Sequence, residues 1–87
     1  MNFNHDPKKS HSNKLKHGLD FDEARALWDD ERGLVIPAHF KDEERFAIIA
    51  RIDQTLWTAI FTKRSQTIRL ISCRRSRKEE VALYEQE

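Results

Sequence analysis

The chain has 87 residues, of which 38% are apolar, a length that supports one domain with one modest core. Cys73 is the only cysteine, which excludes an intramolecular disulfide and the zinc sites that need paired cysteines. Residues 1–13 carry no apolar run typical of a signal peptide, and no apolar stretch of roughly 18 residues occurs elsewhere. We therefore expect residues 1–87 to form a single domain of a soluble, cytoplasmic protein without membrane contact.

The formal net charge of +1 hides a strong segregation of charge along the chain. Residues 20–44 carry nine acidic and three basic side chains, whereas residues 45–78 carry nine basic side chains and one acidic side chain, Asp53. A basic block of this density is typical of phosphate-binding surfaces, although a run of charge is more often a solvated face. The block comprises Arg45, Arg51, Lys63, Arg64, Arg69, Arg74, Arg75, Arg77 and Lys78.

The first predicted helix is Pro7–His17. Asp6 can accept hydrogen bonds from the first turn, and proline is tolerated at the first helical position. Gly18 suits the left-handed residue just past the end. Leu15 is the one strongly apolar residue in this helix, so we expect the helix to lie on the surface, within reach of a ligand.

A second helix is predicted to begin after Asp20, because Asp20 and Glu23 have the spacing of a capping box. It should end between Asp29 and Arg32, before Gly33. Its apolar face, which we expect to pack on a core, comprises Phe21, Ala24, Leu27 and Trp28.

Four strands are predicted from segments rich in β-branched and aromatic residues, at 34–36, 45–52, 56–64 and 67–74. The last three are joined by short connections, so they should form an antiparallel meander. Side chains should alternate between the two faces of the fourth strand. One face carries Ile68, Leu70 and Ser72, and the opposite face carries Arg69, Ile71 and Cys73.

Ser76 and Glu79 have the spacing of another capping box, which predicts a C-terminal helix carrying Val81, Leu83 and Tyr84. The predicted fold class is therefore α+β, with two N-terminal helices, a four-stranded antiparallel sheet and a short C-terminal helix.

Metal and nucleophile chemistry have little support in the sequence. His5, His11 and His17 are spaced by six, which does not give the i, i+4 pair of a helical metal site, so we predict no metal and no cofactor. The chain has two glycines, too few for a glycine-rich phosphate loop. Cys73 has no nucleophile signature and fits a small, half-buried strand residue better.

The remaining reactive residues suit RNA cleavage without a metal. That reaction needs a group that helps to deprotonate the ribose 2′-hydroxyl, cations that stabilise the phosphate dianion and a donor to the leaving oxygen. Arginine suits the second role because its fork pairs with two phosphate oxygens. His17, Glu43, Glu44 and Tyr84 could fill the others, but His17 could equally be a helix-end residue and Tyr84 a core anchor.

The order of motifs along nearly the whole chain resembles the BrnT toxins. The opening match comprises Asp6, Pro7, Lys8, Asn13, Lys16, His17, Gly18, Phe21, Glu23 and Ala24, and the middle match comprises Glu43, Glu44, Arg45, Phe46 and residues 61–64. The closing match comprises residues 68–75, one of Glu79 and Glu80, and Tyr84. Cys73, Lys63 and Ala50 depart from the family pattern, but none of these departures removes an arginine.

The resemblance implies a RelE-like fold and a metal-independent endoribonuclease that arrests translation and growth. It also implies neutralisation by a BrnA-like antitoxin with a ribbon-helix-helix DNA-binding domain, in a toxin–antitoxin heterotetramer.

From the residues and the resemblance together, we predict the following site. The predicted catalytic residues are Arg64, Arg69, Arg74, Lys16, His17 and Tyr84, and the predicted RNA-binding residues are Arg45, Arg51, Lys63, Arg75 and Arg77. The alternative is a non-catalytic module that uses the same basic surface to bind nucleic acid or an acidic protein.

Overall fold

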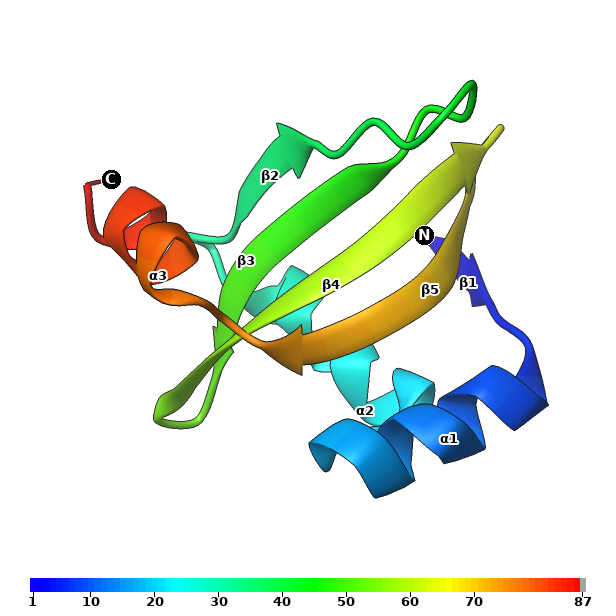
Figure 1. Cartoon of the computed structure of the whole chain (residues 1–87), viewed down its shortest axis with the longest axis horizontal. Coiled ribbons are helices and arrows are strands. Elements are labelled where there is room, and N and C mark those ends of the chain that lie inside the picture. The colour runs from blue at the N-terminus through cyan, green and yellow to red at the C-terminus, as the bar shows by residue number, and fades with distance from the viewer. Residues whose placement is uncertain (87) are drawn as a thin grey trace.

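The computed structural model describes residues 1–86 and confirms the α+β class (Figure 1). The helices are α1 (Pro7–His17), α2 (Phe21–Ala24), the 3-10 helix η1 (Arg25–Asp29) and α3 (Lys78–Glu85). The strands are β1 (Asn2–Asn4), β2 (Leu34–Pro37), β3 (Phe46–Ile52), β4 (Thr55–Arg64) and β5 (Thr67–Arg75). Within residues 1–86, no helix has the length and apolar character needed to cross a membrane.

The sheet has five strands in the order β1-β5-β4-β3-β2, and it is mixed. The predicted antiparallel meander of β3, β4 and β5 is confirmed, and β2 pairs antiparallel with β3. The prediction of a four-stranded, purely antiparallel sheet is wrong, because β1 adds a parallel edge strand beside β5. Strand β1 forms by pairing with a distant segment, since Phe3 pairs with Ile68. Its three residues are too few to show the alternation that predicts a strand.

Helix α1 has the predicted bounds and lies along the outer edge of β5 (Figure 1). Asp6 accepts a hydrogen bond from the Lys8 N–H at 2.9 Å, and Gly18 ends the helix with φ +90°. The buried Asn13 side chain makes the two hydrogen bonds with β5 that a neighbouring strand would make. Its Nδ2 donates to the Cys73 carbonyl at 2.7 Å, and its Oδ1 accepts from the Cys73 N–H at 3.2 Å. The backbone groups of Cys73, on the part of β5 that β1 does not reach, are thereby satisfied.

The second helix begins as predicted, but only one turn of it is an α-helix. Asp20 accepts from the Glu23 N–H at 2.7 Å and Glu23 accepts from the Asp20 N–H at 2.9 Å, which confirms the capping box. After Ala24 the chain tightens into η1, which ends at Asp29, within the predicted range. The prediction of one continuous helix is wrong, because the second part is a 3-10 helix. The segment must end at Asp30, whose carboxylate holds β3 through the Arg51 N–H at 2.9 Å.

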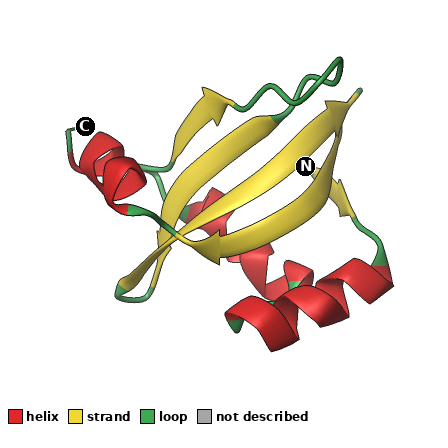
Figure 2. Cartoon of the chain, viewed as in Figure 1, coloured by secondary structure: helices red, strands yellow, loops and turns green. Residues whose placement is uncertain are grey.

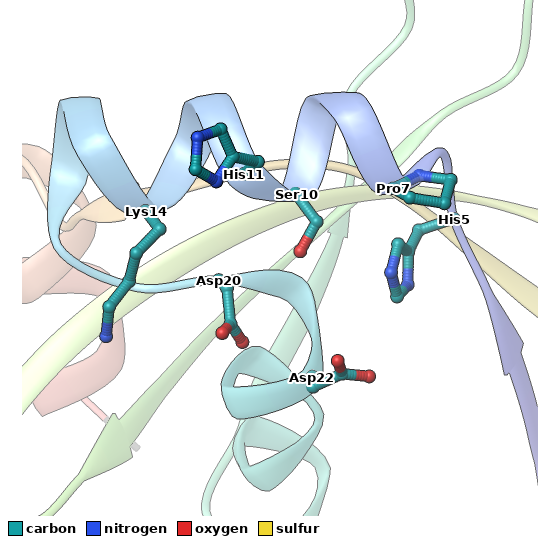
Figure 3. A pocket seen from close by; sticks show the side chains of 7 residues that line it. All are labelled: His5, Pro7, Ser10, His11, Lys14, Asp20 and Asp22. Atoms are coloured by element: carbon teal, nitrogen blue, oxygen red, sulfur yellow. The ribbon is translucent and has the colours of Figure 1, made fainter.

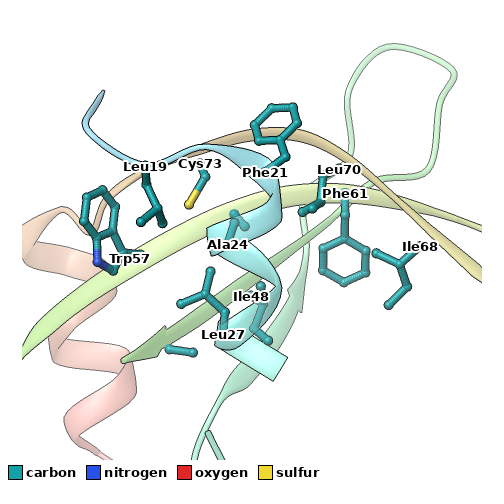
Figure 4. Close-up of a cluster of buried hydrophobic side chains, with 12 residues drawn as sticks. Leu19, Phe21, Ala24, Leu27, Ile48, Trp57, Phe61, Ile68, Leu70 and Cys73 are labelled. Atoms are coloured by element: carbon teal, nitrogen blue, oxygen red, sulfur yellow. The ribbon is translucent and has the colours of Figure 1, made fainter. Parts of the chain in front are cut away.

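The core lies between the sheet and the layer formed by α1, α2 and η1 (Figures 2 and 4). Trp28 sits edge-on to two rings, with centroid distances of 5.1 Å to Phe3 and 5.1 Å to Phe61. The predicted apolar face of the second helix is confirmed, since Phe21 and its neighbours are buried. The buried core residues are Leu19, Phe21, Ala24, Leu27, Ile48, Ala50, Trp57, Ala59, Phe61, Ile68, Leu70 and Cys73.

A β-bulge changes which side chains of β5 face this core. The register shifts between Ile60 and Phe61, which pair with Ser72 and Leu70 respectively. Beyond the shift, Cys73 joins Leu70 in the core. The prediction that Cys73 lies opposite Leu70 is therefore wrong, because strict alternation fails where one extra residue enters a strand. Cys73 is fully buried rather than half-buried.

Helix α3 packs on the other face of the sheet, at one end only (Figure 1). It begins at Lys78, with Arg77 before the first turn and Glu80 accepting from the Arg77 N–H at 2.7 Å. The predicted capping box of Ser76 and Glu79 is wrong by one residue. The Ser76 hydroxyl lies instead 2.8 Å from the Thr58 hydroxyl of β4, so a tertiary contact competes with the local cap.

Candidate functional site

The sheet face opposite the core is covered by α3 at one end and by no helix of residues 1–86 at the other. We call this uncovered part the open face. The loop at 38–44 and the β4–β5 turn lie together at its far end, away from α3 (Figure 1). Strand pairing and alternation assign to the open face Arg45, Ala47, Ile60, Thr62, Arg64, Thr67 and Arg69.

Arg64 and Arg69 are brought together on the open face, across the β4–β5 turn. Arg64 pairs with Thr67, so Arg69 is its diagonal neighbour on the adjacent strand, at roughly 7–8 Å between backbones. Arg69 donates from Nη1 to the Asn4 side chain at 3.0 Å, and Arg64 is exposed without a hydrogen bond or ion pair in residues 1–86. Register and alternation therefore place both arginines on the same face of the sheet, and within residues 1–86 neither has a carboxylate partner.

Arg74, also a predicted catalytic residue, is held by Glu80 at the α3 end. Its Nη1 and Nη2 donate to the two carboxylate oxygens at 2.8 and 2.9 Å. Glu80 also accepts from the Thr58 hydroxyl at 3.0 Å. The hydrogen bonds from Arg74 lower the pKa of Glu80 to about 2, an effect that exceeds the opposing effect of burial. The fork of Arg74 is thus fully used inside the protein.

Tyr84 lies at the same covered end and is 4% exposed. Its hydroxyl donates to Asp30 Oδ2 at 2.8 Å. The guanidinium carbons of Arg32 and Arg51 lie 5.8 and 5.9 Å from the centroid of its ring. Burial, and next the hydrogen bond to Asp30, raise the pKa of Tyr84. These contacts anchor α3 on β3, as the core-anchor interpretation of Tyr84 requires.

Lys16 and His17 line a pocket between α1 and the outer edge of β5. Ser72 also lines this pocket, and its pairing with Ile60 assigns its side chain to the sheet face opposite the core. Ser72 is three residues from Arg69, a separation of roughly 10 Å along a strand. The pocket therefore adjoins the open face. Its remaining lining residues are Lys9, Ser12, Asn13 and Ile71.

The other predicted RNA-binding residues do not share one surface. Lys63 lies on the core side of the sheet, with Nζ 4.8 Å from the centroid of Phe46. Arg75 lies on that side as well, 5.8 Å from the ring of Trp57. Arg51 and Arg77 lie at the α3 end, so Arg45 is the one residue of this group beside Arg64 and Arg69. A basic block that is continuous in sequence is thus divided by the alternation of strands.

The histidines of the N-terminal segment are also separated. His5 and His11 line a pocket between α1 and the start of α2 (Figure 3). His17 lines the other pocket, beside β5. In the first pocket, the Ser10 hydroxyl accepts from the Phe21 N–H at 2.9 Å, so it joins two helices. Across residues 1–86, no three His, Cys, Asp or Glu side chains are grouped as metal ligands.

Sequence reasoning missed two contributors to the site, Asn4 and Glu80. Asn4 is in the unpredicted strand β1, and nothing local connects it to Arg69. Glu80 could have been suspected as a partner of Arg74, because the resemblance includes Glu79 or Glu80, but the sequence does not choose between them.

The fold and the site define a small α+β protein whose open sheet face presents an arginine pair, beside a basic pocket at the sheet edge. A profile of the BrnT family, described as the ribonuclease toxin of type II toxin–antitoxin systems, matches residues 5–80. The chain belongs to this family, and the resemblance predicted from the sequence is confirmed. A search of curated proteins found no match.

Proposed function

We propose that this chain cleaves RNA internally on its open face, without a metal ion, and thereby arrests translation and growth. The observation that carries the proposal is the Arg64–Arg69 pair, which strand register places on the open face. Arg69 lies roughly 10 Å along β5 from Ser72, which lines the Lys16–His17 pocket. The family's description as a ribonuclease supports this reading. An arginine pair supplies the cations that a phosphate transition state requires.

In the proposed reaction, the ribose 2′-hydroxyl attacks the adjacent phosphorus. Its proton leaves to a base, the bond to the 5′-oxygen breaks, and that oxygen takes a proton from an acid. The products are a cyclic phosphate and a free 5′-hydroxyl. Arg64 and Arg69 stabilise the crowded phosphate, because each guanidinium can pair with two of its oxygens. Lys16 and His17 are the candidates for proton transfer and for orienting the RNA.

Arg74 and Tyr84 take supporting roles in this proposal. Both residues use their polar atoms to hold α3, through Glu80 and Asp30 respectively. We therefore assign them to positioning the sheet end and retain a direct catalytic role for Arg64 and Arg69. Of the predicted RNA-binding residues, Arg45 contributes on the open face, while Arg51, Lys63, Arg75 and Arg77 would contribute at most long-range attraction.

The proposed partner is a BrnA-like antitoxin with a ribbon-helix-helix DNA-binding domain, in a heterotetramer with the toxin. Family membership supports a protein antitoxin in general. An antitoxin that covers the open face would block access of phosphates to Arg64 and Arg69, which is the simplest route to neutralisation.

The test is RNA cleavage by Arg64→Lys and Arg69→Lys, with Arg25→Lys as the matched control on the opposite side of the sheet. Lysine keeps the charge but loses the fork, so each site variant should lose about 100- to 1000-fold in rate at saturating enzyme. RNA binding should fall much less, and EDTA should leave the wild-type rate unchanged. Full activity in both site variants, or complete inhibition by EDTA, would contradict the proposal. An equal loss of binding and rate would favour the non-catalytic binding module.

A further inference from the structure

The loop between β2 and β3 holds an exposed aromatic ring at the rim of the open face. Phe40 and Glu43 close a tight turn with two backbone hydrogen bonds, at 3.1 and 2.9 Å, and Lys41 within it has φ +56°. The Phe40 side chain lies outside the core, and the residue is 49% exposed. An ordered turn thus leaves a large apolar ring half-exposed, with the Lys41 Nζ 5.3 Å from its centroid.

Arg45 lies against this ring. Its guanidinium carbon is 4.6 Å from the Phe40 centroid, and its Nη2 makes a long contact of 3.3 Å with Glu43. The Nε of Arg45 is buried and has no hydrogen-bond partner within residues 1–86. Buried polar groups are nearly always paired, so an unpaired guanidinium nitrogen indicates a side chain that lacks its partner.

A second unpaired polar atom lies next to it on the open face. The Thr62 hydroxyl is buried without a hydrogen-bond partner in residues 1–86, and the residue is 5% exposed. Phe46 pairs with Phe61, so Arg45 and Thr62, which adjoin them in the chain, are neighbours across β3 and β4. Thr62 also pairs with Arg69 on β5. The two unsatisfied groups therefore lie between the exposed ring and the arginine pair.

We propose that Phe40, Arg45 and Thr62 form a subsite for one unpaired nucleotide of single-stranded RNA, next to the phosphate held by Arg64 and Arg69. Phe40 stacks on the base. Arg45 turns its Nε and Nη atoms onto the neighbouring phosphate, exchanging the long contact with Glu43 for a bidentate one, and the Thr62 hydroxyl donates to the same group. A base inside a duplex is already stacked on both faces, so the subsite selects unpaired RNA.

This inference rests on the proposed function for the location of the cleaved bond, but its test measures binding alone. The probe is a short fluorescein-labelled single-stranded RNA with 2′-O-methyl riboses, which cannot be cleaved, together with versions that carry one abasic residue at each position. Dissociation constants are measured by fluorescence anisotropy for the wild type, Phe40→Ala, Phe40→Trp and the control Leu83→Ala, an exposed apolar residue on α3.

We expect Phe40→Ala to weaken binding about 5- to 100-fold, the range typical of losing one stacked base, while Phe40→Trp and Leu83→Ala bind like the wild type. One abasic position should weaken wild-type binding by a similar factor and should not weaken Phe40→Ala further. Arg45→Lys should weaken binding through the lost fork. Unchanged binding by Phe40→Ala would overturn the subsite. So would an abasic residue that weakens binding by the same factor in Phe40→Ala as in the wild type at every position.

The two proposals fail in different ways. One result is that an abasic residue at a single RNA position weakens binding by the wild type but not by Phe40→Ala, while the Arg64→Lys and Arg69→Lys variants cleave fully. This result would refute the catalytic pair and leave the subsite standing. Loss of cleavage in those variants without such coupling would refute the subsite alone. A wild-type chain that binds no single-stranded RNA would refute both.

Discussion

The first prediction concerns the charge of Glu80, which should contribute to the free energy of unfolding and to its dependence on pH. The Glu80→Gln variant keeps the size and the acceptor oxygen of the side chain but removes the charge that faces Arg74. It leaves a guanidinium with 23% side-chain exposure beside a neutral amide. We expect a loss of stability at neutral pH, because a partly buried charge loses its counterion.

The size of the effect follows from the pKa of Glu80, which falls from 4.5 to about 2 on folding. At about 1.4 kcal/mol per pKa unit, this fall corresponds to about 3 kcal/mol. Solvent reaches the Arg74–Glu80 pair, with side-chain exposures of 23% and 17%, and screening reduces the expected contribution to about 1–2 kcal/mol. For a domain of this size, that corresponds to a decrease in Tm of about 5–15 °C.

The lowered pKa of Glu80 also determines how its contribution to stability changes with pH. A carboxyl with a lowered folded-state pKa stabilises the fold above the unfolded pKa of 4.5, and this stabilisation is lost as the pH falls toward about 2. The free energy of unfolding, measured with urea at several pH values, should therefore decrease less for Glu80→Gln than for the wild type as the pH falls from 7 to 2. Glu79→Gln, an exposed change on the same turn, is the control. Equal pH dependence in wild type and Glu80→Gln would refute the reasoning, as would an equal cost for Glu79→Gln.

Three further predictions concern stability and reactivity. Asn13→Ala removes the amide that satisfies the edge of β5 and should cost about 2–4 kcal/mol in urea unfolding, while Ser12→Ala on the exposed side should cost almost nothing; similar costs would contradict the edge role. Gly18→Ala should cost about 1 kcal/mol, because φ is +90° although no atom lies within 4 Å of an added Cβ; a neutral Gly18→Ala in thermal unfolding would be inconsistent with this strain. Burial raises the pKa of Cys73 to about 12, so its thiol should react with iodoacetamide at pH 8 only after unfolding, and rapid labelling of the native protein would disprove its burial.

The sequence by itself determined the elements whose signals are local. Helix α1 has the predicted bounds because Asp6, Pro7 and Gly18 act on their own neighbours, through a side-chain cap, a fixed φ and a left-handed end. The cap of α2 and the three long strands are also local features, set by residue spacing and by short turns. The arginine pair was predictable for the same reason, since two residues of turn place Arg64 and Arg69 near each other.

Tertiary structure alone decided the features that depend on distant partners. Strand β1 exists because Phe3 pairs with Ile68, and three residues carry no pattern of their own. Cys73 faces the core because a bulge shifts the register. Arg74 is withdrawn from the surface by Glu80, and alternation divides the basic block between two faces. The open face itself is defined by where α3 docks, and that docking depends on contacts such as Tyr84 with Asp30, separated by 54 residues, whose free energy exists only once both segments are in place.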